Sequence, residues 1–296
     1  MELSHSHSDH RLRVSALSGL GVFVAETIAY PFELIGTIIK SQHKRVPILA
    51  TTKELINERG LAALYKGCST LVWTTFFPNI AYFYIYDSLN DFAVNYVNKY
   101  FGIGATHYIP PISSLLAESV YVILSVPADT VQTRMQLSSS QYQYSGLLSG
   151  AYDTIRKEGL LRLFSASYLY IMQLVIYTPM QFTLYEWLKM SKLNPSPNKN
   201  SISYLKSVEF TFMATSCAAI ITNPINTLVV RYQVTDFSSK EGKGLNGWRI
   251  LRDNFKKYGI RDLNRGMCAR LLQTNINSMV FLPIYEMARQ RYGLNE

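Results

Sequence analysis

Long apolar stretches alternate with polar, basic segments along the whole chain. They run roughly over 12–40, 68–97, 108–137, 166–190, 203–234 and 267–291. Each is long enough for a tilted helix that crosses the hydrocarbon layer of a membrane, which takes about 20 residues. The pattern predicts an all-α membrane protein with six transmembrane helices.

The odd-numbered stretches are not uniformly apolar, because Glu26, Glu118 and Glu209 interrupt them. A charge inside a membrane helix normally faces a bundle interior or a water-filled cavity. The mean hydropathy of +0.04 is low for a membrane protein and agrees with helices that each carry a polar face. We therefore expect six amphipathic helices around a wet interior.

Three kinds of landmark recur about every hundred residues and divide the chain into repeats. We predict a polar N-terminal tail over 1–11, which includes His5, His7 and His10, and repeats over 12–105, 106–200 and 201–296 that form one integral domain. The landmarks are prolines 96 and 97 residues apart, and glycines and acids that are each 99 and 100 apart: Pro31, Pro127 and Pro224; Gly60, Gly159 and Gly259; Asp87, Glu186 and Glu286.

The charge is unevenly distributed between the connecting loops. The chain has 29 Lys and Arg against 20 Asp and Glu, and the segments 40–66, 134–162 and 231–270 hold six, four and ten of the basic residues. The loops 98–107 and 188–206 hold one and four. Because basic loops stay on the inner side of a membrane, both termini are expected on the opposite side.

Composition and motifs exclude several classes. Three separate cysteines without a CxxC pair exclude a disulfide scaffold and a cysteine-based zinc site. There is no Gly-rich phosphate loop or hydrolase motif, so an enzyme is not expected, and neither is a metal or a cofactor. The basic residues lie in loops between apolar stretches and form no aromatic-interleaved patch, which argues against nucleic acid as a partner.

The hundred-residue repeat, with a proline in each odd stretch and a Gly–aromatic–basic–Gly turn, resembles the mitochondrial carrier family from about Leu12 to Arg291. The family motif has an acid two residues after the proline, bases after five and seven, and Gln after nine. Repeat two matches except at the first base, and repeats one and three depart further. The motif positions are Pro127, Asp129, Gln132, Arg134 and Gln136; Pro31, Glu33, Gly36, Ile38 and Lys40; Pro224, Asn226, Val229, Arg231 and Gln233.

The resemblance implies a pseudo-threefold barrel with short matrix-side helices and kinks at Pro31, Pro127 and Pro224. It also implies a matrix gate built from the acids and bases of these motifs. Here that gate would comprise Glu33, Asp129, Gln132 and Asn226, and no base stands at any of the three gate-base positions.

A second gate on the cytoplasmic side is better preserved, and its expected residues are Asp87, Glu186, Lys189, Glu286 and Arg289. We therefore expect this outer ring to dominate, so that the protein is closed toward its termini. Glu33 and Asp129 should then stay apart and hydrated.

The family's substrate-contact positions fall on Thr74, Gln173 and Gln273, and Glu26 also points to the cavity in the family pattern. None of the three contact positions is charged, whereas anion carriers bring Arg or Lys there. These residues favour a cationic or neutral solute, and polar packing inside the bundle is the other interpretation.

Basic turns before two even-numbered helices suggest lipid sites, because helix N-termini attract phosphate. By resemblance, cardiolipin would bind at Lys66, Gly67, Arg265 and Gly266, and less well at Ser165 in repeat two.

The sequence thus predicts a multi-pass protein of the mitochondrial inner membrane with both termini toward the intermembrane space. Its function would be solute transport by alternating access, altered or lost because the matrix gate lacks its bases. The alternative is a non-transporting structural subunit of a larger inner-membrane complex, such as a respiratory-chain complex, with other subunits as partners.

Overall fold

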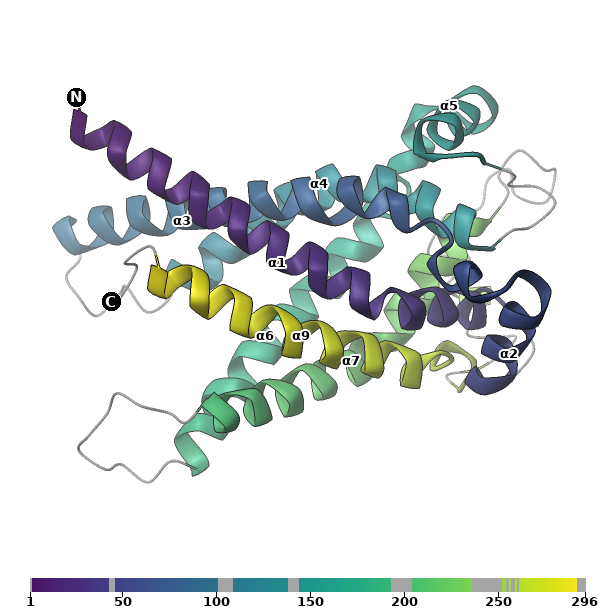
Figure 1. The fold of residues 1–296 in the computed structure, drawn as a ribbon. Coiled ribbons are helices and arrows are strands. Elements are labelled where there is room, and N and C mark those ends of the chain that lie inside the picture. The colour runs from purple at the N-terminus through teal and green to yellow at the C-terminus, as the bar shows by residue number, and fades with distance from the viewer. Residues whose placement is uncertain are drawn as a thin grey trace.

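Each repeat begins with a long helix that contains its landmark proline and ends with a second long helix (Figure 1). The computed structural model describes residues 2–42, 46–100, 109–137, 144–192, 204–235 and 261–291, with single positions between 252 and 259. Within these residues the long helices are α1 (Glu2–Ser41), α3 (Phe77–Tyr100), α4 (Ile109–Leu137), α6 (Ser167–Lys192), α7 (Tyr204–Val234) and α9 (Met267–Arg291).

Four of the long helices are apolar enough to cross a membrane by length and composition. These candidate spans are Leu12–Ser41, Ile112–Leu137, Leu160–Ser191 and Lys206–Val234. Helices α3 and α9 have 24 and 25 residues, which corresponds to about 36 Å of helix. They are long enough to span but carry more polar residues, such as Asp87 in α3 and Arg270 in α9.

The long helices close into a ring. Helix α1 packs against α3, and the ring continues through α4, α6, α7 and α9 back to α1. The first long helices of the three repeats, which are α1, α4 and α7, also contact one another in pairs. This arrangement is the barrel that the repeats predict.

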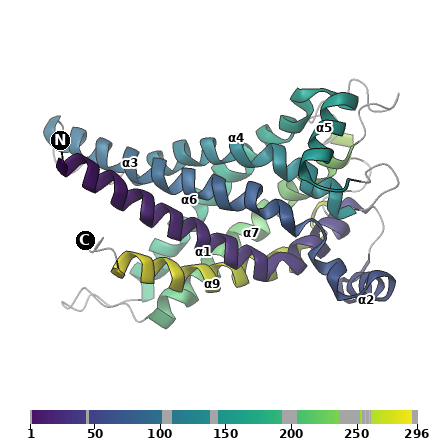
Figure 2. The ribbon, with the colours of Figure 1, turned by 45° about the horizontal axis from the view of Figure 1, so that its top comes forward.

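The start of α1 and the end of α9 lie at one end of the barrel, here called the outer end (Figures 1 and 2). The short helices α2 (Ile48–Arg59) and α5 (Leu147–Glu158) lie at the opposite end, the inner end. Gly60 and Gly159 end these short helices with φ of 73° and 92°, a conformation that glycine adopts readily. The recurring glycines therefore mark helix ends.

Each landmark proline lies inside a continuous helix, with Pro31 in α1, Pro127 in α4 and Pro224 in α7. Proline removes one backbone hydrogen bond from the helix interior. The expected kinks at these positions stay a prediction.

The polar N-terminal segment is helical. The backbone of residues 2–11 continues α1 and does not form an irregular tail. No proline or glycine occurs between Glu2 and Ser18, so nothing in the sequence stops the helix, and extending an existing helix needs only one hydrogen bond per added residue.

Candidate functional site

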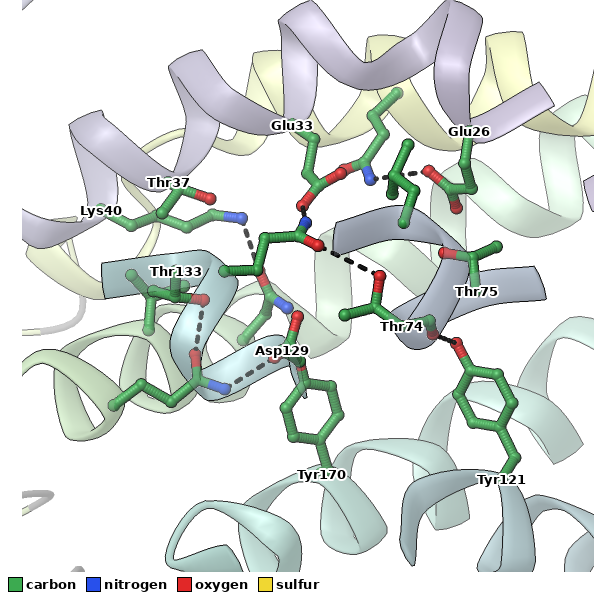
Figure 3. A pocket seen from close by; sticks show the side chains of 16 residues that line it. Glu26, Glu33, Thr37, Lys40, Thr74, Thr75, Tyr121, Asp129, Thr133 and Tyr170 are labelled. Carbon is green, nitrogen blue, oxygen red and sulfur yellow. Dashed lines mark hydrogen bonds between the residues drawn. The ribbon is translucent and has the colours of Figure 1, made fainter. Parts of the chain in front are cut away.

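A polar cavity of about 160 Å³ lies in the centre of the barrel (Figure 3). Its lining comes from α1, α4, α6, α7, α9 and the irregular turn Val72–Phe76 that precedes α3. Among the residues that the structure describes, the cavity is lined by the carboxylates of Glu26, Glu33 and Asp129 and by one ammonium group, that of Lys40.

Glu26 on α1 faces α9. Its Oε1 accepts a hydrogen bond of 2.6 Å from Asn277 Nδ2, and its Oε2 a longer one of 3.5 Å from Gln273 Nε2. The amides are neutral donors, so they hold the carboxylate in place without cancelling its charge.

Glu33, two turns further along α1, faces α4. Its Oε1 accepts hydrogen bonds from Gln132 Nε2 at 2.8 Å and from Gln136 Nε2 at 3.3 Å. The Gln132 oxygen in turn accepts from the hydroxyls of Thr70 at 2.5 Å and Thr74 at 3.0 Å. Because both polar atoms of Gln132 are engaged, its orientation is fixed.

Asp129 on α4 faces α7 and α6. Its Oδ2 accepts hydrogen bonds from Gln233 Nε2 at 2.6 Å and from the Tyr170 hydroxyl at 2.5 Å. Like the other two carboxylates of the cavity, Asp129 is thus held by neutral donors.

Lys40 closes the remaining side, between α1 and α7. It is only 5% exposed, and its Nζ lies 2.5 Å from Asn226 Oδ1. The Asn226 amide nitrogen donates to Gln173 Oε1 at 3.2 Å, which connects α7 to α6.

These contacts contradict the expectation that Glu33 and Asp129 stay apart and hydrated. Hydrogen bonds join α1 to α4, α4 to α7 and α7 to α1, so the end of the cavity formed by these residues is held closed on all three sides. Counting charges was misleading, because amide side chains of suitable length can hold a carboxylate as a base would. The expectation also overlooked Lys40.

The donors that the sequence interpretation missed follow a simple rule. Gln136, Gln233 and Lys40 each lie four residues after a gate-base position, which is one helical turn further toward the inner end. Each reaches the acid or amide of a neighbouring helix. The signal was present in the sequence, since these are the residues nine positions after each proline.

The expected substrate-contact residues divide into two groups. Thr74 and Gln273 line the cavity, together with Glu26. Gln173 does not line the cavity, but it accepts a hydrogen bond from Asn226, which does line it. Glu118 lies elsewhere, beside a separate small space between α4 and α6 that is lined mainly by apolar side chains.

The predicted outer ring falls largely outside the described side chains. The side chains of Glu186, Glu286 and Arg289 lie outside the described ones. Those of Asp87 and Lys189 are described and are half-buried. Closure of the outer ring therefore stays a prediction.

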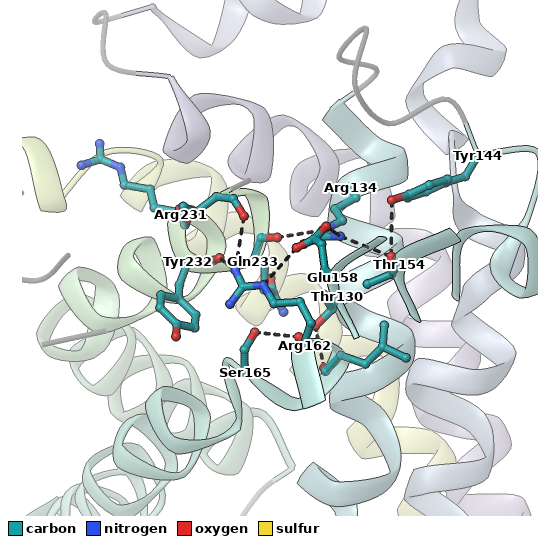
Figure 4. Close-up of polar contacts among 12 residues, drawn as sticks. Thr130, Arg134, Tyr144, Thr154, Glu158, Arg162, Ser165, Arg231, Tyr232 and Gln233 are labelled. Carbon is teal, nitrogen blue, oxygen red and sulfur yellow. Dashed lines mark hydrogen bonds and ion pairs between the residues drawn. The ribbon is translucent and has the colours of Figure 1, made fainter. Parts of the chain in front are cut away.

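A second polar cluster at the inner end joins repeats two and three (Figure 4). The Arg134 guanidinium, which is fully buried, holds Glu158 at the end of α5 through bonds of 2.6 and 3.0 Å. Arg162 Nε donates to the same carboxylate at 3.2 Å. Arg134 Nε donates to the Gln233 backbone oxygen at 2.9 Å, and Arg162 Nη2 donates to that of Tyr232 at 3.0 Å.

The third repeat contains a similar polar cluster. Arg231 Nε donates to the Lys40 backbone oxygen at 3.0 Å, and Arg231 Nη2 lies 2.6 Å from Asp262. Arg265 pairs with Asp262 at 2.5 Å and donates from Nη1 to the Gln42 oxygen at 2.9 Å. The guanidinium expected at a lipid phosphate therefore already has partners within the protein.

The other expected lipid residues lie just before the second long helical segment of repeats one and three. Gly67 and Gly266 have φ of 83° and 67°. Lys66 is half-buried, and its backbone oxygen accepts a 2.7 Å hydrogen bond from the Tyr30 hydroxyl.

A closed ring of helices in three repeats, arranged around a polar cavity, defines a multi-pass membrane carrier. The chain belongs to the mitochondrial carrier protein family, whose model matches residues 9–97, 106–195 and 200–296. Relatives of this chain include proteins named as carriers.

Several carriers and membrane proteins are similar over most of their length. Peroxisomal membrane protein PMP34 of Mus musculus is 26% identical, covering 92% of this chain and 91% of its own. Mitoferrin of Dictyostelium discoideum is 25% identical, and the similarity covers 95% of this chain and 96% of the relative. The mitochondrial S-adenosylmethionine carrier protein of Xenopus laevis is 25% identical, covering 78% and 82%.

Proposed function

We propose that this carrier moves a small organic cation through its central cavity by alternating access. The supporting observation is the charge of the lining, which holds three carboxylates and one ammonium. Among the described residues, each carboxylate accepts its hydrogen bonds from neutral donors, and none of the three forms an ion pair there. A cationic solute would provide the missing countercharge, which matters most where little water is present.

Within this proposal Glu26 anchors the positive group of the solute, because it lies nearest the outer end of the three carboxylates along the chain. Thr74 and Gln273 offer neutral hydrogen-bonding groups beside it, and Gln173 positions Asn226. An anion would meet no arginine in the described lining, and three carboxylates would repel it.

The inner gate in this proposal differs from one made of ion pairs. Each of its hydrogen bonds joins one charged group to one neutral amide, so it lacks the second charge that an ion pair would have. We infer that transport is retained but altered, with an inner gate that opens at a lower cost. Contacts across all three helix junctions favour a working gate over a purely structural subunit.

Uptake into proteoliposomes tests the proposal. The probes are choline and S-adenosylmethionine as cations, a neutral amino acid, and ADP as an anion; S-adenosylmethionine also appears in the name of one relative. We expect saturable uptake of at least one cation. Glu26→Gln keeps the shape of the side chain but removes its charge, and should reduce kcat/KM for that cation by about tenfold or more.

Glu118→Gln is the matched control, because Glu118 is a half-buried carboxylate outside the cavity. It should leave uptake unchanged. Uptake of ADP but of neither cation would contradict the proposal. Uptake of the neutral amino acid that is insensitive to Glu26→Gln would identify a neutral solute instead.

For location, we propose the mitochondrial inner membrane, with the inner end of the barrel in the matrix and both termini in the intermembrane space. The basic loops and the mitochondrial names of several relatives support this orientation and compartment. A terminal tag should be cleaved by protease added to mitoplasts. Co-purification with peroxisomes, where the name of one relative places that protein, would contradict it.

We also propose that cardiolipin binds where Lys66–Gly67 and Arg265–Gly266 precede helices. Backbone N–H groups at these helix starts are available to phosphate oxygens.

A further inference from the structure

We propose that Lys40 is the positioning residue that locks α1 to α7 at the inner gate, and that it acts in place of a base at position 36. Its ammonium lies 2.5 Å from Asn226 Oδ1, across the junction between repeats one and three. The side chain is 5% exposed and lines the inner half of the cavity near Glu33 and Asp129 (Figure 3).

Two glycines make room for this side chain. A Cβ atom built on Gly36 would lie 4.0 Å from Lys40 Nζ, so the ammonium occupies space beside the position of the missing base. A Cβ atom built on Gly266 would lie 3.2 Å from both Cγ and Cε of Lys40. The lysine stem therefore packs against the backbone of Gly266 and turns back toward Gly36.

The other two junctions support the assignment, because they use the same relative position. Gln136 donates to Glu33 between α1 and α4, and Gln233 donates to Asp129 between α4 and α7. Lys40 is the equivalent residue of α1, and its ammonium makes the third junction the one with a charged donor. Because the Asn226 oxygen is neutral, only a charged donor makes this third bond a charge-assisted one, as the carboxylates do at the other two junctions.

The inference rests on the proposed function only in treating the α1–α7 contact as a gate. Exchanging the Lys40 ammonium for a neutral amide weakens its hydrogen bond to the neutral Asn226 oxygen, which should shift an open–closed equilibrium by about fivefold. This shift can be measured without any transported solute, so a failure of the cation proposal does not affect the test.

The experiment measures access to the cavity from the inner end. Thr75→Cys, in the cavity lining, is introduced into a chain whose Cys68, Cys217 and Cys268 are replaced by serine. A membrane-impermeant maleimide is applied to the inner side of reconstituted vesicles. Lys40→Gln leaves only a neutral donor for the neutral Asn226 oxygen, so it should increase the labelling rate by about fivefold.

The decisive variant moves the base back by one turn. Gly36→Lys combined with Lys40→Gln should restore slow labelling, because a lysine at 36 can reach Asn226 through the space that Lys40 leaves. Space for the new side chain exists, since the nearest heavy atom to a Cβ at 36 is Ala269 Cβ at 3.4 Å. Lys53→Gln removes an exposed lysine of α2 and is the matched control, with no expected change.

Two results would overturn the inference. Labelling of Lys40→Gln at the rate of the unmodified chain would show that Lys40 does not hold the gate. Fast labelling that the added Gly36→Lys fails to slow would show that Lys40 acts only by packing on Gly266.

If Lys40→Gln does not fold, Asn226→Asp provides the same test with Lys40 intact. The resulting ion pair should slow labelling below the unmodified rate, and an unchanged rate would refute the assignment.

Discussion

Glu158 offers the sharpest test of what holds the inner end together. Its carboxylate, with 5% side-chain exposure, accepts hydrogen bonds from the guanidinium groups of Arg134 and Arg162, whose side chains are 0% and 7% exposed. Glu158→Gln leaves two buried cations with one neutral acceptor between them. Breaking a buried ion pair by changing one partner costs about 3–5 kcal/mol. Because the glutamine oxygen still accepts one bond, we expect a loss of about 3 kcal/mol.

For a chain of this size, each kcal/mol lost from the free energy of unfolding lowers the Tm by a few degrees. Glu158→Gln should therefore lower the Tm by about 6–12 °C. The assay is thermal unfolding of the detergent-solubilised carrier, followed by intrinsic tryptophan fluorescence. Glu54→Gln is the matched control, because Glu54 is an exposed glutamate on α2, the corresponding short helix of repeat one. If Glu158→Gln lowers the Tm no more than Glu54→Gln does, the buried cluster does not stabilise the inner end.

The remaining predictions concern packing and lipid. Gly150→Ala should lower the free energy of unfolding by about 1–3 kcal/mol, because its Cβ would lie 2.5 Å from Val131 Cγ1. Gly146→Ala, which meets no atom within 4 Å, should be neutral in the same unfolding assay, and equal Tm values for the two variants would contradict the packing argument. Lys66→Gln should reduce cardiolipin retention in native mass spectrometry more than Ser165→Ala does, and equal retention would argue against the site.

The fold was predictable because its signals are periodic. Prolines, glycines and acids repeat at one spacing, and the apolar stretches have lengths set by the membrane. The family match and the ring of long helices confirm the three repeats and the carrier-type all-α membrane fold. The helical continuation of α1 back to Glu2 was not predicted. A polar segment without a proline or glycine carries no signal for the residue at which the helix begins.

The site was only half predictable. Glu33, Asp129 and Asn226 lie at the junctions between the first long helices of the repeats, where helix periodicity puts them on faces that meet. Their partners were not predictable from spacing alone. The reach of Lys40 depends on the absence of side chains at Gly36 and Gly266, and Gly266 is distant in sequence.

The inner gate shows why the number of charged residues is a poor guide to the strength of a contact. Each junction combines side-chain hydrogen bonds with different backbone links: Arg134 reaches the Gln233 oxygen between α4 and α7, and Arg231 reaches the Lys40 oxygen between α7 and α1. At the junction between α1 and α4, Ile38 occupies the corresponding motif position and has no guanidinium to donate. Hydrogen bonds to a charged group contribute about 1.5–3 kcal/mol each, so several of them at one junction offset part of what the missing second charge would supply. A gate of this kind can close without the bases that the motif lacks, and its three junctions differ in strength because their donors differ.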